Sequence, residues 1–144
     1  MSKQTNQANQ TKAWSIADAE HLYRVKRWSN GYFDIGECGN LMVIPRYNEP
    51  NLKINMREVI DEMQAKNITF PAVIRFHDIL RSQVELINKT FRNAIEDSDY
   101  EGKYFGVFPV KVNQMREVIE EIVDVGNRFN YGLEAGSKPE LVAA

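Results

Sequence analysis

A lysine lies near the end of the most apolar stretch of the chain. The stretch starts at Tyr104, and Lys111 stands among the apolar residues Phe105, Val107, Phe108, Val110 and Val112. Desolvating an ammonium group costs several kcal/mol unless the group is paired or loses its proton. Burial lowers the pKa of an amine and makes it a nucleophile toward aldehydes. Lys111 therefore either reaches solvent at a strand end or holds its amine in a dry pocket, and the spacing alone favours the first.

Two other charged side chains lie near the ends of apolar runs. Arg75 belongs to the run 70–76 and Glu134 to the run 129–135. In parallel α/β folds the active groups collect at the carboxyl ends of the strands. We expect Lys111, Glu134 and Arg75 to approach one mouth, although Arg75 could equally pair with a carboxylate on the outside. His77 could reach the same mouth or begin a helix.

Strands and helices alternate along the part of the chain that would position these residues. Strands are predicted at 70–76, 104–112 and 129–135, and helices at 78–98 and 113–126, with a helix start at Ser137. The helix 78–98 carries apolar residues at steps of three and four, which indicates one buried face. Pro109 removes a ladder donor from the second strand and predicts a bulge there. This alternation is typical of a parallel α/β fold.

The N-terminal part follows a different pattern. Residues 1–13 are polar and without periodicity, which predicts a disordered tail. A capping box at Ser15 and Asp18 predicts a helix within 14–28. The runs 32–35 and 41–44 flank a turn that holds Cys38, and they predict a hairpin. A loop and a capped helix over residues 55–67 follow.

Size and composition exclude several classes of protein. The 144 residues carry a net charge of −2, a pI of about 5.7 and 43% hydrophobic residues. No basic face is visible, so nucleic acid is not an expected partner. No apolar stretch approaches the roughly 20 residues of a membrane span. One cysteine and a polar N-terminus favour a cytoplasmic protein.

Two motifs carry a resemblance to a known family. They are Phe108-Pro109-Val110-Lys111-Val112-Asn113-Gln114 and Tyr131-Gly132-Leu133-Glu134-Ala135-Gly136-Ser137-Lys138-Pro139-Glu140-Leu141. Their sequence and order resemble the cofactor-lysine segment and the next strand of the alanine-racemase-like, pyridoxal-phosphate-dependent decarboxylases. The most similar version is that of the bacterial biosynthetic arginine decarboxylases. The resemblance covers residues 14–144 and is specific from Tyr104 onward.

The resemblance implies a fold and its domains. The fold class is α/β, with residues 51–144 forming the first units of a (β/α)8 TIM barrel of the alanine-racemase type. Residues 14–50 would be a helix and β-hairpin segment that packs with a C-terminal β domain. Such a barrel needs about 250 residues, so we expect the chain to be the N-terminal fragment of a longer protein and inactive alone.

The resemblance also implies a site and an activity. Lys111 would be the catalytic residue that binds pyridoxal 5'-phosphate, with Glu134 beside the cofactor. The full-length protein would be a cytoplasmic homo-oligomer that converts L-arginine to agmatine and carbon dioxide for putrescine and spermidine synthesis. Magnesium is implied by the family alone, and no metal ligand is assigned.

Two alternatives stay open at this point. One is a sister decarboxylase or racemase of the same fold that acts on another amino acid. The other is a small non-catalytic α/β domain that binds a partner, in which Lys111 is a surface lysine.

Overall fold

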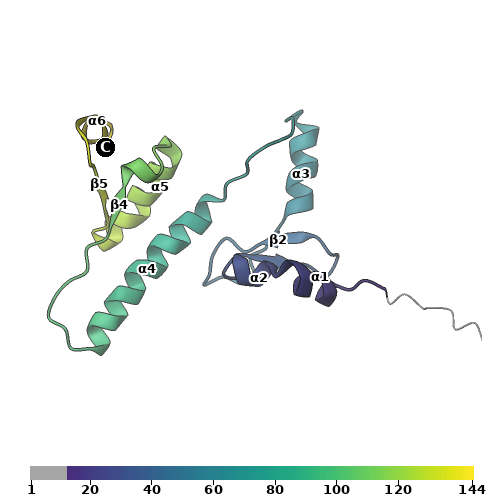
Figure 1. Cartoon of the computed structure of the whole chain (residues 1–144), viewed down its shortest axis with the longest axis horizontal. Helices are drawn as coiled ribbons and strands as arrows, with labels where there is room; N and C mark the ends of the chain where they lie inside the picture. The colour runs from purple at the N-terminus through teal and green to yellow at the C-terminus, as the bar shows by residue number, and fades with distance from the viewer. Residues whose placement is uncertain (1–12) are drawn as a thin grey trace, which may run out of the picture.

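The structure, a computed structural model, describes residues 13–144, so nearly all of the expected tail lies outside it. The elements form two groups joined by an extended segment (Figure 1). The N-terminal group contains α1 (Ile16–Tyr23), α2 (Val25–Trp28), β1 (Phe33–Ile35), β2 (Leu41–Val43), β3 (Ile54–Asn55) and α3 (Met56–Ala65). The C-terminal group contains α4 (His77–Asp97), β4 (Val107–Pro109), α5 (Arg116–Gly126), β5 (Gly132–Glu134) and α6 (Lys138–Ala143), with 3₁₀ turns at Val110–Val112 and Asn127–Phe129. The expected mixture of α and β elements is confirmed.

The N-terminal helix begins as predicted but is broken in the middle. Ser15 Oγ accepts a hydrogen bond from the Asp18 N–H at 3.2 Å, and the Asp18 carboxylate accepts one from the Ser15 N–H at 3.0 Å. Arg24 then adopts a left-handed φ of 51°. Its N–H donates to the Glu20 carbonyl at 2.8 Å, so Arg24 ends α1 and α2 begins at the next residue.

The predicted hairpin is confirmed and gains a third strand. β1 and β2 pair antiparallel with Phe33 opposite Val43, and the turn 36–40 holds the exposed Cys38. β3 pairs with β2 in a region where the sequence predicts a loop and a helix cap. Asn55 belongs to both elements, because it ends β3 and its Oδ1 accepts the Arg57 N–H in the first turn of α3 at 3.0 Å.

One predicted strand is wrong. Residues 70–76 run as extended chain between α3 and α4 and pair with no strand of residues 13–144. Val73 is 77% exposed, and Arg75 is exposed as well. Strand propensity measures how well side chains fit against neighbours, so an apolar run forms no strand where no neighbouring strand is present. Arg75 consequently lies in a linker and not at a strand end.

The C-terminal group is built on the parallel pair β4–β5. Phe108 lies opposite Leu133, and Pro109 lies opposite Glu134. The core between the helices and this pair consists of Val84, Val118, Ile122, Val125 and Phe129, against which Leu80, Phe108 and Tyr131 pack. The predicted order of a long helix, a strand, a helix, a strand and a helix start is confirmed.

The strand before Lys111 is shorter than predicted. It spans only Val107–Pro109, and Phe105 and Val107 are 62% and 53% exposed. A near-continuous apolar run predicts a strand that is covered on both faces, and this is wrong for the described residues because their helices cover one face only. The predicted bulge at Pro109 is also wrong, because the strand ends at Pro109 and a 3₁₀ turn follows. Because the strand ends at Pro109, the missing N–H of the proline interrupts no further strand pairing.

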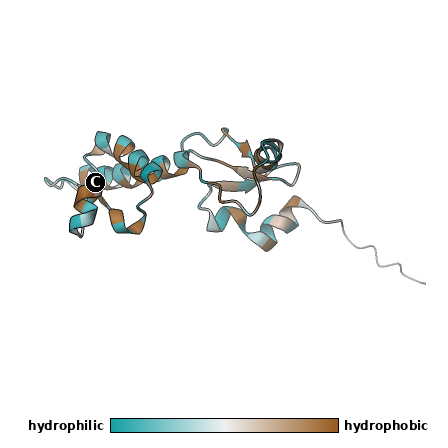
Figure 2. Ribbon diagram, turned by 90° about the horizontal axis from the view of Figure 1, so that it is seen from above, coloured by the Kyte–Doolittle hydropathy of each residue, from teal (hydrophilic) through white to brown (hydrophobic). Residues whose placement is uncertain are grey.

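The two groups contact each other through the first half of α4. The Tyr47 N–H donates to Ser82 Oγ at 3.1 Å, and Gln83 Nε2 donates to the Tyr32 hydroxyl at 2.7 Å. Figure 2 shows that the helices of both groups carry hydrophilic and hydrophobic residues on different sides. This is the amphipathic pattern of helices that cover a core.

Shortening a side chain at the centre of the core should lower the stability of the protein strongly. Ile122 is 1% exposed at the centre of the α4–α5 cluster. Because Ile122→Ala removes buried methyl groups and leaves a cavity, we expect a loss of about 2–5 kcal/mol in the free energy of unfolding, measured by urea denaturation. Val142→Ala removes methyl groups from a residue that is 89% exposed and should change stability by less than about 0.5 kcal/mol. Equal effects of the two changes would contradict the assigned core.

The hairpin contains one half-buried carboxylate that is held by two lysines. Asp34 Oδ1 lies 3.2 Å from Lys26 Nζ, and Asp34 Oδ2 lies 3.5 Å from Lys53 Nζ. The Ile35 N–H donates to Asp34 Oδ1 at 2.8 Å. Burial raises the pKa of Asp34, but these hydrogen bonds and the two lysine charges outweigh it and hold the pKa below its usual value.

A carboxyl with a lowered pKa makes stability depend on pH. The stabilisation from Asp34 is fully present above the pKa of the unfolded chain, near 4, and is lost as the pH falls through the folded pKa. Asp34→Asn should therefore cost about 1 kcal/mol at pH 7 and progressively less at acidic pH, measured by urea denaturation at several pH values. Asp61→Asn, which removes an exposed pair with Arg57 on α3, is the matched control and should cost less. A cost for Asp34→Asn that does not change with pH would refute this role.

Candidate active site

The candidate residues lie at one edge of the parallel pair. β4 and β5 run in the same direction and end together, with Pro109 opposite Glu134. Lys111 follows Pro109 by two residues, in the turn that leaves β4. The structure therefore brings Lys111 and Glu134 to the same carboxyl-terminal edge, where α/β proteins place their active groups.

Lys111 stands in a turn and not in a strand. The predicted strand 104–112 would place Lys111 on the same face as Val107 and Pro109 by alternation, and this is wrong because Val110–Val112 form a 3₁₀ turn. Successive residues of such a turn point about 120° apart, so the alternation of the strand stops at Pro109. Lys111 is exposed, and its ammonium group has no hydrogen bond or ion pair with another residue of 13–144.

Glu134 lies on the face of the strand pair that the helices leave open. Its neighbour Leu133 points to the helices, and successive residues of a strand point to opposite faces. A Cβ added to Gly136 would come within 3.3 Å of Glu134 Oε1 and 3.5 Å of Glu140 Oε2. Both carboxylates therefore lie close to Gly136, and a side chain there would require a small shift of the Glu134 carboxylate.

The loop after β5 is held by its own hydrogen bonds. The Gly136 N–H donates to Glu140 Oε2 at 2.7 Å, and the Glu140 N–H donates to Ser137 Oγ at 3.3 Å. The predicted cap of Ser137 on α6 is thus confirmed, although the glutamate accepts from Gly136. These bonds fix the backbone directly after Glu134.

Asn113 closes the turn that carries Lys111. Its Oδ1 accepts the Met115 N–H at 3.0 Å, and α5 begins at Arg116 with Met115 in the capping position. The sequence predicts a helix from residue 113, and the observed helix begins three residues later, at Arg116. The result is a turn that is anchored on both sides, by the pairing of Pro109 before it and by Asn113 after it.

Arg75 and His77 do not join this edge. His77 is the first residue of α4, and its Nδ1 lies 3.7 Å from Glu121 Oε1 on α5. Glu121 and Asp124 also bind Arg81, and their hydrogen bonds raise the pKa of the Arg81 guanidinium. The histidine thus belongs to an ionic cluster between two helices.

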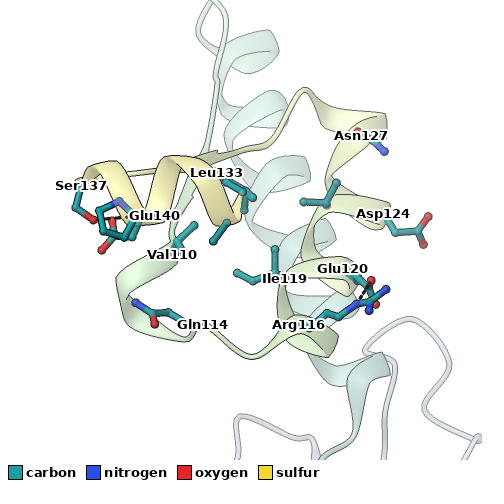
Figure 3. A pocket seen from close by; sticks show the side chains of 14 residues that line it. Val110, Gln114, Arg116, Ile119, Glu120, Asp124, Asn127, Leu133, Ser137 and Glu140 are labelled. Carbon is teal, nitrogen blue, oxygen red and sulfur yellow. Dashed lines mark hydrogen bonds and ion pairs between the residues drawn. The ribbon is translucent and has the colours of Figure 1, made fainter.

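A groove of about 930 Å³ lies behind the strand pair, between α5 and α6 (Figure 3). Its apolar wall includes Val110, Ile119 and Leu133, and neither Lys111 nor Glu134 lines it. The sequence patterns described above do not predict this groove. The signal for it is a second apolar row on α5, formed by Ile119 and Val123, which lies beside the row that packs into the core. Val110 directly precedes Lys111 and Leu133 directly precedes Glu134. The two apolar residues face the helices, and the two charged residues do not line the groove.

Residues 13–144 show no metal centre and no membrane helix. They contain no group of three or more His, Cys, Asp or Glu side chains that could hold a metal ion. None of their helices is long and apolar enough to cross a membrane.

The fold and the site define a mixed α/β protein with a lysine at the carboxyl edge of a parallel strand pair. Comparison with known proteins then points to one family, although no family model matches the chain. The chain is 44% identical over 131 residues to the biosynthetic arginine decarboxylase of Rhodopirellula baltica and 45% identical over 131 residues to that of Gloeobacter violaceus. These matches cover 91% of the chain and 20% of each relative.

A solved structure agrees with these relatives. The crystal structure of the biosynthetic arginine decarboxylase SpeA from Campylobacter jejuni matches 85% of the chain and 20% of its own, with a TM-score of 0.75 and 31% identity. The chain is therefore similar to biosynthetic arginine decarboxylases over most of its length and spans about a fifth of the length of these proteins. The resemblance seen in the two sequence motifs is confirmed.

Proposed function

We propose that this chain supplies the lysine-bearing segment of a pyridoxal-phosphate-dependent enzyme that converts L-arginine to agmatine and carbon dioxide. The similarity of more than nine-tenths of the chain to arginine decarboxylases carries this proposal. The position of Lys111 and Glu134 at one carboxyl-terminal strand edge supports it. Putrescine and spermidine synthesis, a cytoplasmic location and a homo-oligomeric state belong to the same proposal and rest on the family resemblance.

We infer that the parallel pair belongs to a (β/α)8 barrel of the alanine-racemase type. β4 and β5 are neighbours in the order of the chain, and α4 and α5 cover one face of the pair. The other face is open, and Val107 on it is 53% exposed. Parallel strands are normally covered on both faces, and in a barrel the second face is the inner surface.

The residues at the strand edge fit pyridoxal phosphate in their chemistry. Lys111 offers an exposed primary amine that makes no ion pair with a described carboxylate, and a primary amine in its neutral form is the group that bonds covalently to an aldehyde. Lys111 would hold the cofactor, and Glu134, on the open face, would orient it. When bound, the cofactor supplies an electron sink for decarboxylation. Magnesium has no assigned ligand here and is proposed from the family alone.

The two alternatives are weaker. A sister decarboxylase or racemase for another amino acid would share the lysine, but the relatives reported above are all arginine decarboxylases. A non-catalytic interaction domain would give no reason for a lysine and a glutamate at the same strand edge.

The proposal predicts a covalent adduct at one lysine. The full-length protein is mixed with pyridoxal phosphate, reduced with borohydride, digested and mapped by mass spectrometry. We expect the adduct on Lys111. Lys111→Ala should remove it and lower carbon dioxide release from arginine by at least about 100-fold, since a positioned catalytic group is lost.

Lys103→Ala is the matched control, because Lys103 is also exposed and lies just before the same strand. It should leave both the adduct and the activity unchanged. An adduct that forms elsewhere and spares Lys111 would refute the proposed function.

The 144-residue chain alone should show no decarboxylase activity. Its described residues form two parallel strands, whereas the barrel needs eight. The measurement is carbon dioxide release from carboxyl-labelled arginine, with the full-length protein as the positive control. Release by the isolated chain above the level of its Lys111→Ala variant would contradict the requirement for a closed barrel.

A further inference from the structure

We propose that Val110 is a positioning residue for Lys111: its buried side chain fixes the turn from which the lysine projects. This inference rests on the proposed function, because it concerns the same lysine. It assigns a role to a side chain that faces away from the candidate site.

Val110 is the one residue of its turn that is buried. It is 4% exposed, whereas Lys111 is exposed and Val112 is 67% exposed. A 3₁₀ turn of three residues has poor hydrogen-bond geometry and little stability of its own. Contacts with the rest of the protein must therefore hold its conformation, and within the turn only the Val110 side chain is buried.

The contacts of Val110 lie in the wall of the groove behind the strands. Val110 lines the groove together with Leu133 of β5 and Ile119 of α5, and all three are labelled in Figure 3. A β-branched side chain has one strongly preferred rotamer in many settings, so its fit in such a wall is well defined. The groove beside it leaves room for the turn to move if the valine is shortened.

The direction of Lys111 follows from the position of Val110. Because residues of a 3₁₀ turn point about 120° apart, a valine that faces the helices turns the next side chain away from them. The pairing of Pro109 with Glu134 fixes the chain before the turn, and the Asn113–Met115 hydrogen bond fixes it afterwards. Between Pro109 and Asn113, the buried Val110 side chain determines how the turn is oriented about its own axis.

The test measures labelling of Lys111 in full-length variants. Val110→Ala removes two methyl groups and loosens the turn, and Val112→Ala makes the same change on the exposed side of the same lysine. Each protein is titrated with pyridoxal phosphate and reduced with borohydride, and the adduct on Lys111 is measured against the adduct on Lys103. Lys103 is exposed, so its labelling reports the non-specific reaction with pyridoxal phosphate, and urea denaturation of each variant reports any general loss of stability.

For Val110→Ala we expect the concentration that half-labels Lys111 to rise about tenfold relative to wild type, since misplacement by about 1 Å can cost on the order of 100-fold. Val112→Ala should label as wild type does. Equal shifts in both variants, or no shift in Val110→Ala, would overturn the proposal. A wild-type protein that is not labelled at Lys111 would instead refute the proposed function.

If Val110→Ala does not fold, a second variant tests the positioning role of Val110. Val110→Thr keeps the shape of the side chain but places a hydroxyl group against an apolar wall. A rise of about threefold or more in the half-labelling concentration would support the positioning role. Labelling of this variant at the wild-type concentration would overturn it.

Discussion

The parallel pairing of β4 with β5 is the constraint on which the rest of the C-terminal group depends. It places Phe108 beside Leu133 on the helix side and Pro109 beside Glu134 on the open side. The helix side then packs against the core centred on Ile122. Because both strands point the same way, the segments that leave them emerge at one edge, and this brings Lys111 and Glu134 together without a direct contact between them.

The open side and the helix side of the candidate site have different roles. On the open side, an unpaired amine and a carboxylate are available to a ligand. On the helix side, Val110 and Leu133 are held in an apolar wall, and each directly precedes one of these charged residues. Burial of the apolar neighbours fixes the backbone, so the polar residues can remain exposed and still be well placed.

The proposed site rests on resemblance and on geometry. The resemblance of the two motifs proposes Lys111 and Glu134, and about nine-tenths of the chain is similar to arginine decarboxylases. The structure adds that both residues lie at the carboxyl edge of neighbouring parallel strands. Arg75 shows what happens without such support, because its apolar run suggested a strand end and the structure has it in a linker.

The sequence by itself determined the helices α4 and α5, the hairpin, the cap at Ser15 and the presence of a lysine near the end of the apolar run 104–112. These features depend on residue periodicity and on hydrogen bonds between near neighbours, which the order of residues specifies directly. Only the tertiary structure decided that the run 70–76 is unpaired, that Val110–Val112 form a turn, and which face of the strands is covered. Strand pairing and burial depend on segments far apart in the chain, and no local pattern contains that information.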